Sequence, residues 1–319
     1  MFRRQVSVVF CRAPTKNGAV TGAQSNGAEG RTDRVPTAEQ LPPLVARSPL
    51  AVFDEAIVFL RTRPALFLTI AAIGLLPARA ISALLPGTEL RELNTDQLFD
   101  LFIANFAQPG SFITTAISFA LDSFILFVVA AVYGQIAAAW FVGTSPPPKA
   151  LALNTLKRLP ALFAAWLIAK LLMVALGVVS VGVGALAFGV VLAIVAPIMG
   201  AEGVGPIVAI RRSMSLITSK LGQGFLVFVT TGLGAVLIRL AIKQGPGLVL
   251  SNFFAGQIPL PEEAIVAIFD VVGSVIALAF VASASVVLYL DLRVRREGLD
   301  LGFAISQAFP GRAAGVRRG

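Results

Sequence analysis

Four charged residues stand inside apolar stretches of the chain, namely Asp122, Lys170, Arg239 and Asp270. Placing such a charge in hydrocarbon costs at least about 2.5–3.5 kcal/mol, so each should face protein, water or an interface. From the helical rise, Asp270 and Asp122 lie about 10 and 15 Å below the outer starts of their spans, with Lys170 near the midplane. The group predicts either a proton- or ion-linked site or headgroup pocket, or structural ion pairs between helices.

A second set of candidates consists of three basic residues on the segment Gly205–Leu221. The segment has apolar residues at three- and four-residue steps, which are Ile207, Ile210, Met214, Ile217 and Leu221. This spacing predicts an amphipathic helix on the membrane surface. The basic residues Arg211, Arg212 and Lys220 would each contribute about 1 kcal/mol towards anionic headgroups of the cytoplasmic leaflet. They indicate either a topological anchor or a docking site for lipid or protein.

Other chemistry is restricted by the residue types that are present. The chain has no histidine and one cysteine, Cys11. Histidine-based acid/base catalysis, Ser-His-Asp triads and histidine-containing zinc sites are therefore excluded, as is a disulfide framework. The carboxylates Glu297 and Asp300 have no partner base or metal motif nearby. We therefore predict a non-enzymatic protein that needs no cofactor or metal.

The elements that position these residues are predicted to be membrane spans. Hydrophobic residues make up 56% of the chain and charged residues 13%, against roughly 25% charged in soluble proteins. Pro160–Gly200 contains a single charge, Lys170, and has a glycine-rich middle. One span needs about 20 residues, so this stretch predicts two spans joined by a tight turn. Because Lys and Arg flank the apolar runs, the net charge of +9 indicates topology and no nucleic acid partner.

The remaining apolar runs extend this hairpin into a larger fold. The expected spans are Pro64–Leu85, one within Ser111–Val142, the two in Pro160–Gly200, Gly224–Ile242 and Ala264–Leu290. Pro49–Arg63 predicts a further amphipathic helix, with Phe53, Ala56, Ile57 and Leu60 on its apolar face. The predicted fold is all-α: a polytopic transmembrane helical bundle with six spans as three hairpins and cytoplasmic amphipathic helices.

The distribution of basic residues predicts the orientation. Near the spans, most Lys and Arg lie on the side of the two termini, whereas Arg79, Arg91, Arg239 and Lys243 lie on the other side. The positive-inside rule then places both termini in the cytoplasm, with the spans in the inner membrane. The expected domains are a disordered cytoplasmic tail at 1–46, a six-span membrane domain at 47–305 and a basic cytoplasmic tail at 306–319.

Two stretches carry a family resemblance. They run from Glu202 to Leu216 (EGVGPIVAIRRSMSL) and from Tyr289 to Leu301 (YLDLRVRREGLDL). They resemble the bacterial multi-pass family named for the membrane domain of glycerophosphoryl diester phosphodiesterases, and the layout is similar over roughly residues 49–305. Some members of that family carry a soluble barrel phosphodiesterase, and no segment here has the length for one. The resemblance implies a stand-alone membrane domain without the catalytic barrel.

Two functions remain open at this point. The first is a non-enzymatic integral inner-membrane protein that handles lipid or small molecules or scaffolds the envelope, with membrane lipids as partners. The second is a secondary transporter that uses Asp122, Lys170 and Asp270. A transporter should have a wet cavity that joins these three residues, whereas a scaffold should have them dispersed or dry. A protein partner or a second copy of the chain is compatible with either function.

Overall fold

The structure is a computed structural model that describes residues 48–83, 109–141, 143–180, 183–253 and 262–297. Every regular element in these ranges is a helix, so the all-α prediction is confirmed. The tails predicted for 1–46 and 306–319 lie outside the described residues, and so do 84–108, 142, 181–182 and 254–261.

Five of the helices are long and apolar enough to cross a membrane. They are α2 (Pro64–Ala83), α4 (Pro109–Phe141), α5 (Pro148–Val179), α9 (Leu221–Phe253) and α10 (Glu262–Glu297). Three of these helices begin at a proline. Proline suits the first helical turn because an N–H at that position would have no acceptor within the helix, so its absence costs no hydrogen bond. The five match predicted spans, which supports a multi-pass membrane protein at this coarser level.

The second arm of the Pro160–Gly200 hairpin differs from the prediction. The first arm is α5, which starts at Pro148, so the basic segment before Pro160 belongs to the same helix. The second arm is divided into α6 (Val183–Leu192) and α7 (Val195–Glu202), with a break at Ala193 and Ile194. Neither piece alone has the length of a span. The sixth span and the three-hairpin topology therefore stay predictions.

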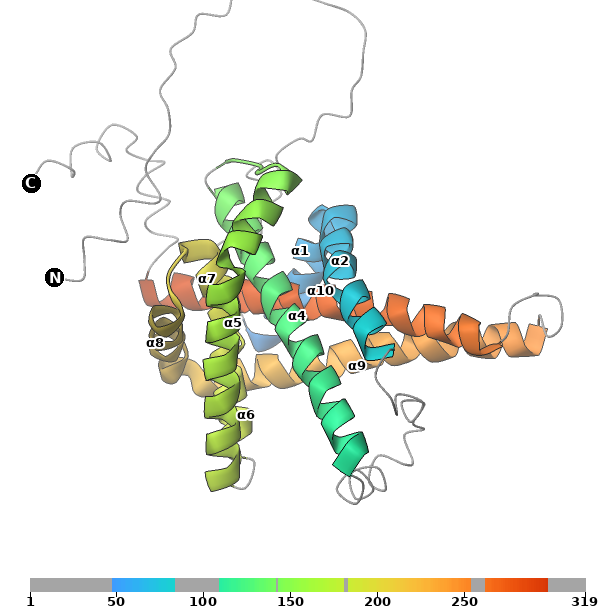
Figure 1. Cartoon of the computed structure of the whole chain (residues 1–319). Coiled ribbons are helices and arrows are strands. Elements are labelled where there is room, and N and C mark those ends of the chain that lie inside the picture. Colours follow the sequence, from blue (N-terminus) through green and yellow to red (C-terminus); the bar gives the residue numbers. More distant parts are fainter. Residues whose placement is uncertain (1–47, 84–108, 142, 181–182, 254–261, 298–319) are drawn as a thin grey trace, which may run out of the picture.

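Figure 1 shows how the long helices are arranged. Helices α4 and α5 run down the view, whereas α9 and α10 lie side by side and run across it. The α9–α10 pair therefore crosses the direction of α4 and α5 and does not continue a row of upright hairpins. The C-terminal part of α10 packs against both α4 and α7.

The core lies where α4, α7 and α10 meet. All residues from Val195 to Gly200 on α7 are buried. Close contact with α4 depends on two glycines, because a Cβ on Gly134 would lie 2.6 Å from the Pro197 carbonyl oxygen and one on Gly200 would overlap the Ala131 carbonyl. Small residues of this kind let helix backbones approach each other within a membrane.

The two predicted amphipathic helices are also packed against the protein. Helix α1 (Pro49–Thr62) is capped by the Ser48 hydroxyl, which accepts from the Ala51 N–H at 3.2 Å. Its fully buried residues are Val52, Ala56 and Phe59, and the predicted stripe residues Phe53, Ile57 and Leu60 are partly buried and packed against the core. The predicted apolar face is therefore confirmed, and it extends to Val52 and Phe59, with α1 packed on α9 and α10.

Helix α8 (Pro206–Ile217) divides its predicted apolar stripe between two sides. Ile210 and Ile217 are buried, whereas Ile207 and Met214 are exposed. The buried side is centred on Ser213, whose hydroxyl donates a hydrogen bond to the Val191 carbonyl near the α6–α7 break. A buried carbonyl needs a hydrogen-bond donor, and the polar residue Ser213 on the inner face of α8 provides it. Hydrophobic periodicity alone does not predict a polar residue on that face.

Candidate functional site

Two of the four predicted intramembrane charges form a pair between α9 and α10. Arg239 donates to both carboxylate oxygens of Asp270, with Nη2 at 2.8 Å from Oδ1 and 3.0 Å from Oδ2. Its Nε also donates to Oδ1 at 3.1 Å. Such forked arginine–carboxylate contacts are among the stronger and more directional hydrogen bonds. This ion pair connects α9 to α10.

The other two charges have contacts on different helices. Asp122 on α4 pairs with Arg79 on α2, with 3.4 Å between Arg79 Nη2 and Asp122 Oδ2. Lys170 on α5 has its Nζ 5.0 Å from the centre of the Phe119 ring on α4, a distance typical of a cation–π contact. Sequence reasoning missed this role of Arg79, which it counted only as a basic residue on the side opposite the termini. The four charges are thus divided among three helix–helix contacts.

The predicted headgroup residues also separate into two kinds. Arg211 and Lys220 are exposed, as that prediction requires. Arg212 is held by two carboxylates, with its Nε 2.6 Å from Glu202 Oε1 and its Nη2 2.7 Å from Glu297 Oε1. Arg212 is therefore engaged in contacts within the protein that connect α7, α8 and α10.

Arg212 belongs to a larger polar cluster that we call the terminal network, which consists of Glu202, Arg212, Tyr289, Arg293 and Glu297. The Tyr289 hydroxyl donates to Glu202 Oε1 at 2.7 Å and accepts from Arg293 Nη1 at 3.1 Å. Arg293 Nε donates to Glu297 Oε2 at 3.0 Å. Tyr289 and Arg293 are buried, and buried charges of this kind are tolerated only when they are paired and hydrogen-bonded.

The terminal network joins the two stretches on which the family resemblance rests. Glu202 and Arg212 come from the first stretch, and Tyr289, Arg293 and Glu297 come from the second. No sequence pattern indicates directly that these stretches touch, because they are separated by more than seventy residues. The one available signal was their complementary charge at the ends of apolar helices.

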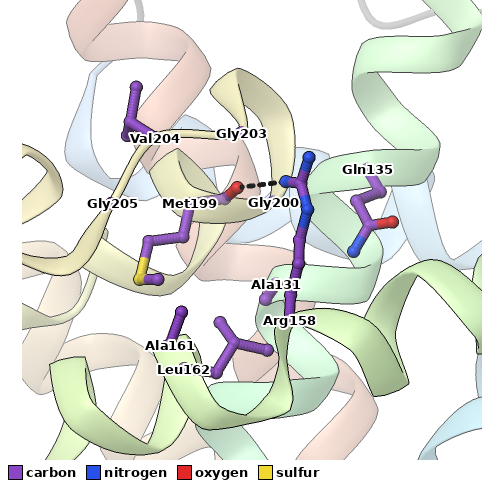
Figure 2. A pocket seen from close by; sticks show the side chains of 10 residues that line it. All are labelled: Ala131, Gln135, Arg158, Ala161, Leu162, Met199, Gly200, Gly203, Val204 and Gly205. Atoms are coloured by element: carbon purple, nitrogen blue, oxygen red, sulfur yellow. Dashed lines mark hydrogen bonds between the residues drawn. The ribbon is translucent and has the colours of Figure 1, made fainter.

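A pocket lies beside the loop between α7 and α8, as Figure 2 shows. It has a volume of about 150 Å³. Arg158 on α5 extends between Gln135 of α4 and the 199–205 segment, and its Nη1 donates to the Met199 carbonyl at 3.2 Å. Gly203 has a φ of 67°, and a Cβ there would lie 2.9 Å from Arg158 Nη2. A glycine at this position therefore suits both the turn and the guanidinium.

These features define what the site can do chemically. Within the described ranges, no three Asp, Glu, Cys or His side chains gather in a way that could hold a metal ion. The polar groups that do gather are arginine and glutamine donors next to the pocket and matched ion pairs elsewhere. Such donors can bind an anion and can hold helices together.

The five apolar helices of spanning length, with ion pairs between α2 and α4 and between α9 and α10, indicate a multi-pass helical membrane protein. Comparison of the chain with protein-family models, with curated proteins and with solved structures found no match. The resemblance to the phosphodiesterase membrane domain therefore stays a prediction that rests on the two stretches.

Proposed function

We propose that this protein is a non-enzymatic integral protein of the bacterial inner membrane that acts as a lipid-contacting scaffold of the envelope. The observation that carries the proposal is the pairing of the intramembrane charges. Asp270 is held by Arg239, Asp122 by Arg79, and Lys170 lies against Phe119. Each contact joins two helices, which is the role of a structural ion pair and not of a shared ion-conducting site.

The terminal network supports the same role at the other end of the helices. It connects the end of α7 to α8 and to the last turns of α10 through charge-assisted bonds of 2.6–3.1 Å. The basic residues of this end support a cytoplasmic position under the positive-inside rule. In this orientation both termini are cytoplasmic, and Arg211 and Lys220 face the inner-leaflet headgroups.

A secondary transporter is the alternative, and one observation favours it. The α6–α7 arm is interrupted at Ala193 and Ile194, with α7 buried in the protein. Discontinuous helices at membrane depth line the substrate sites of many transporters. In this chain the break is bridged by the Ser213 hydroxyl on the Val191 carbonyl, and the buried side chains of α7 are apolar. We therefore favour a structural break.

The deciding experiment measures proton flux and lipid scrambling in proteoliposomes that contain wild type or Lys170→Met. Lys170 is the test position because the transporter hypothesis needs its charge for flux, whereas in the scaffold that charge serves only the cation–π contact with Phe119 and carries no flux. We expect both proteins to give the proton flux of protein-free liposomes. Wild-type flux that falls in Lys170→Met would contradict the scaffold and support transport. Equal rates in the two proteins, at any level, would rule out a Lys170-dependent transporter.

A further inference from the structure

The pocket beside Arg158 is lined by one positively charged side chain and otherwise mainly by apolar surface. Its polar lining comes mainly from Arg158 and Gln135, while Ala131, Ala161 and Leu162 provide apolar surface. Liquid water takes about 30 Å³ per molecule, so about 150 Å³ holds roughly five waters or one group of similar size. A phosphate with its adjoining ester carbons is a group of that size and of mixed polarity.

Arg158 has hydrogen-bonding capacity beyond its contact with Met199. A guanidinium has five N–H donors in a planar fork, and the bond to the Met199 carbonyl uses Nη1. The side chain is exposed at the pocket, unlike Arg212, whose guanidinium is bound to two carboxylates. Arginine is the residue best suited to a phosphate, because its fork can bind two oxygens at once.

The depth of Arg158 on α5 matches the headgroup region of a bilayer. The twenty residues from Pro160 to Val179 form the apolar part of α5, and at 1.5 Å per residue they extend about 30 Å, the thickness of the hydrocarbon core. Arg158 precedes this part by two residues. Its guanidinium therefore lies at the boundary where lipid phosphates are found.

The surface next to the pocket is apolar and exposed. Gly205 lines the pocket, and the next residues after Pro206 are Ile207 and Val208, with exposed fractions of 59% and 45%. A soluble anion would gain nothing from these side chains, whereas the acyl chains of a lipid would cover them.

We propose that this pocket binds the phosphate of an anionic phospholipid from the cytoplasmic leaflet, with Arg158 as the main donor and Gln135 beside it. The inference rests on the proposed orientation in the membrane, and it specifies the lipid contact of the proposed scaffold. It also moves the main headgroup contact from Arg212 to Arg158.

The test titrates the full-length protein in detergent with phosphatidylglycerol or phosphatidylcholine and measures bound lipid by native mass spectrometry. Arg158→Gln removes the charge and should lower the affinity for phosphatidylglycerol about tenfold or more. Its matched control is Arg61→Gln, an exposed arginine that lies outside the pocket lining and is not one of the proposed headgroup residues, which should change that affinity about threefold or less. Affinity for phosphatidylcholine should change less than affinity for phosphatidylglycerol in Arg158→Gln.

A second variant keeps the charge and fills the space. Gly205 lines the pocket in extended backbone, and a Cβ there meets no atom within 4 Å, so Gly205→Leu leaves Arg158 and its bond to Met199 in place. We expect it to weaken phosphatidylglycerol binding as well. Gly222→Leu is the control, because a Cβ at Gly222 also meets no atom within 4 Å and Gly222 does not line the pocket. If Arg158→Gln fails to fold, this pair decides the question.

Three outcomes would overturn the proposal. One is an equal loss in Arg158→Gln and Arg61→Gln, which indicates diffuse surface attraction. Another is equal binding by Gly205→Leu and Gly222→Leu. The third is displacement of lipid by inorganic phosphate at similar concentration, which would assign the pocket to a soluble anion. These binding results are independent of proton flux, so a Lys170-dependent flux would contradict the proposed scaffold and leave the pocket assignment standing.

Discussion

The two arms of the Pro160–Gly200 hairpin have similar apolar sequences and opposite surroundings. Along α5, large side chains are exposed, with Leu171 at 63% and Val178 at 78%. Along α7, every residue from Val195 to Gly200 is buried, and Ile198 is fully enclosed. The same overall hydrophobicity therefore serves a lipid-facing surface in one arm and a protein core in the other.

The difference arises from small residues and from backbone shape. Helix α7 has Gly200 where it touches α4, and α4 has Gly134 where it touches Pro197. The outward face of α5 has leucine and valine instead, which prevent a close approach of backbones. The break at Ala193 and Ile194 frees α7 to lie against α4 independently of α6. Close packing, and not apolar content, thus selects the buried arm.

The largest expected effect comes from adding one methyl group to the buried arm. In Gly200→Ala the new Cβ would overlap the Ala131 carbonyl, so α7 and α4 must move apart. We expect a loss of about 3 kcal/mol in the free energy of unfolding, at the upper end for overpacking. The measurement is unfolding by SDS in mixed micelles, followed by circular dichroism.

The control for that variant is Gly222→Ala, where a Cβ meets no atom within 4 Å. It should leave the stability unchanged or slightly raise it, because alanine favours helices more than glycine does. If Gly200→Ala were as stable as Gly222→Ala, that result would contradict the close contact between the backbones of α7 and α4.

An intermediate effect is expected from removing a side chain in each arm. Ile198→Ala leaves a cavity in the core and should cost about 2 kcal/mol, because the packing loss persists in a membrane. Leu171→Ala should cost about 0.5 kcal/mol or less, because an exposed leucine meets lipid in the folded and the unfolded states. Both are measured by the same SDS unfolding. Equal losses would mean that the two arms do not differ in burial.

The sequence was sufficient to predict the class of fold. Apolar runs near 20 residues predicted α2, α4, α5, α9 and α10, because a bilayer requires a certain length and composition whatever the packing. The break in the second arm could not be predicted in this way, since neither Ala193 nor Ile194 disfavours an apolar helix strongly. The contact that accompanies the break comes from Ser213, a residue that follows by about twenty positions.

The candidate site was predicted by residue type and not by partner. Asp122, Lys170, Arg239 and Asp270 were identified because charges in apolar spans are unusual, and that signal is local. Their partners depend on how helices cross. The pairing of Asp122 with Arg79 and the orientation of the α9–α10 pair are properties of packing that hydropathy does not contain. The terminal network and the Arg158 pocket depend on contacts between distant stretches for the same reason.

Among the losses expected inside the protein, the smallest concerns the break between α6 and α7. Ser213 is fully buried and donates its hydroxyl hydrogen to the Val191 carbonyl. Ser213→Ala removes the donor with little change in volume, and an unpaired carbonyl inside a protein costs about 1–2 kcal/mol, less when another bond compensates. We expect a loss of about 1 kcal/mol in SDS unfolding.

Ser215→Ala is the matched control, because Ser215 lies on the exposed side of the same helix and bonds only within it, to the Arg212 carbonyl. It should change the stability by a few tenths of a kcal/mol at most. A second readout is hydrogen exchange of the amides at 193–195, which should become faster in Ser213→Ala and stay unchanged in Ser215→Ala. Faster exchange at the break with normal exchange in α5 would show that Ser213 stabilises the division of the second arm, because α5 has no such break to protect.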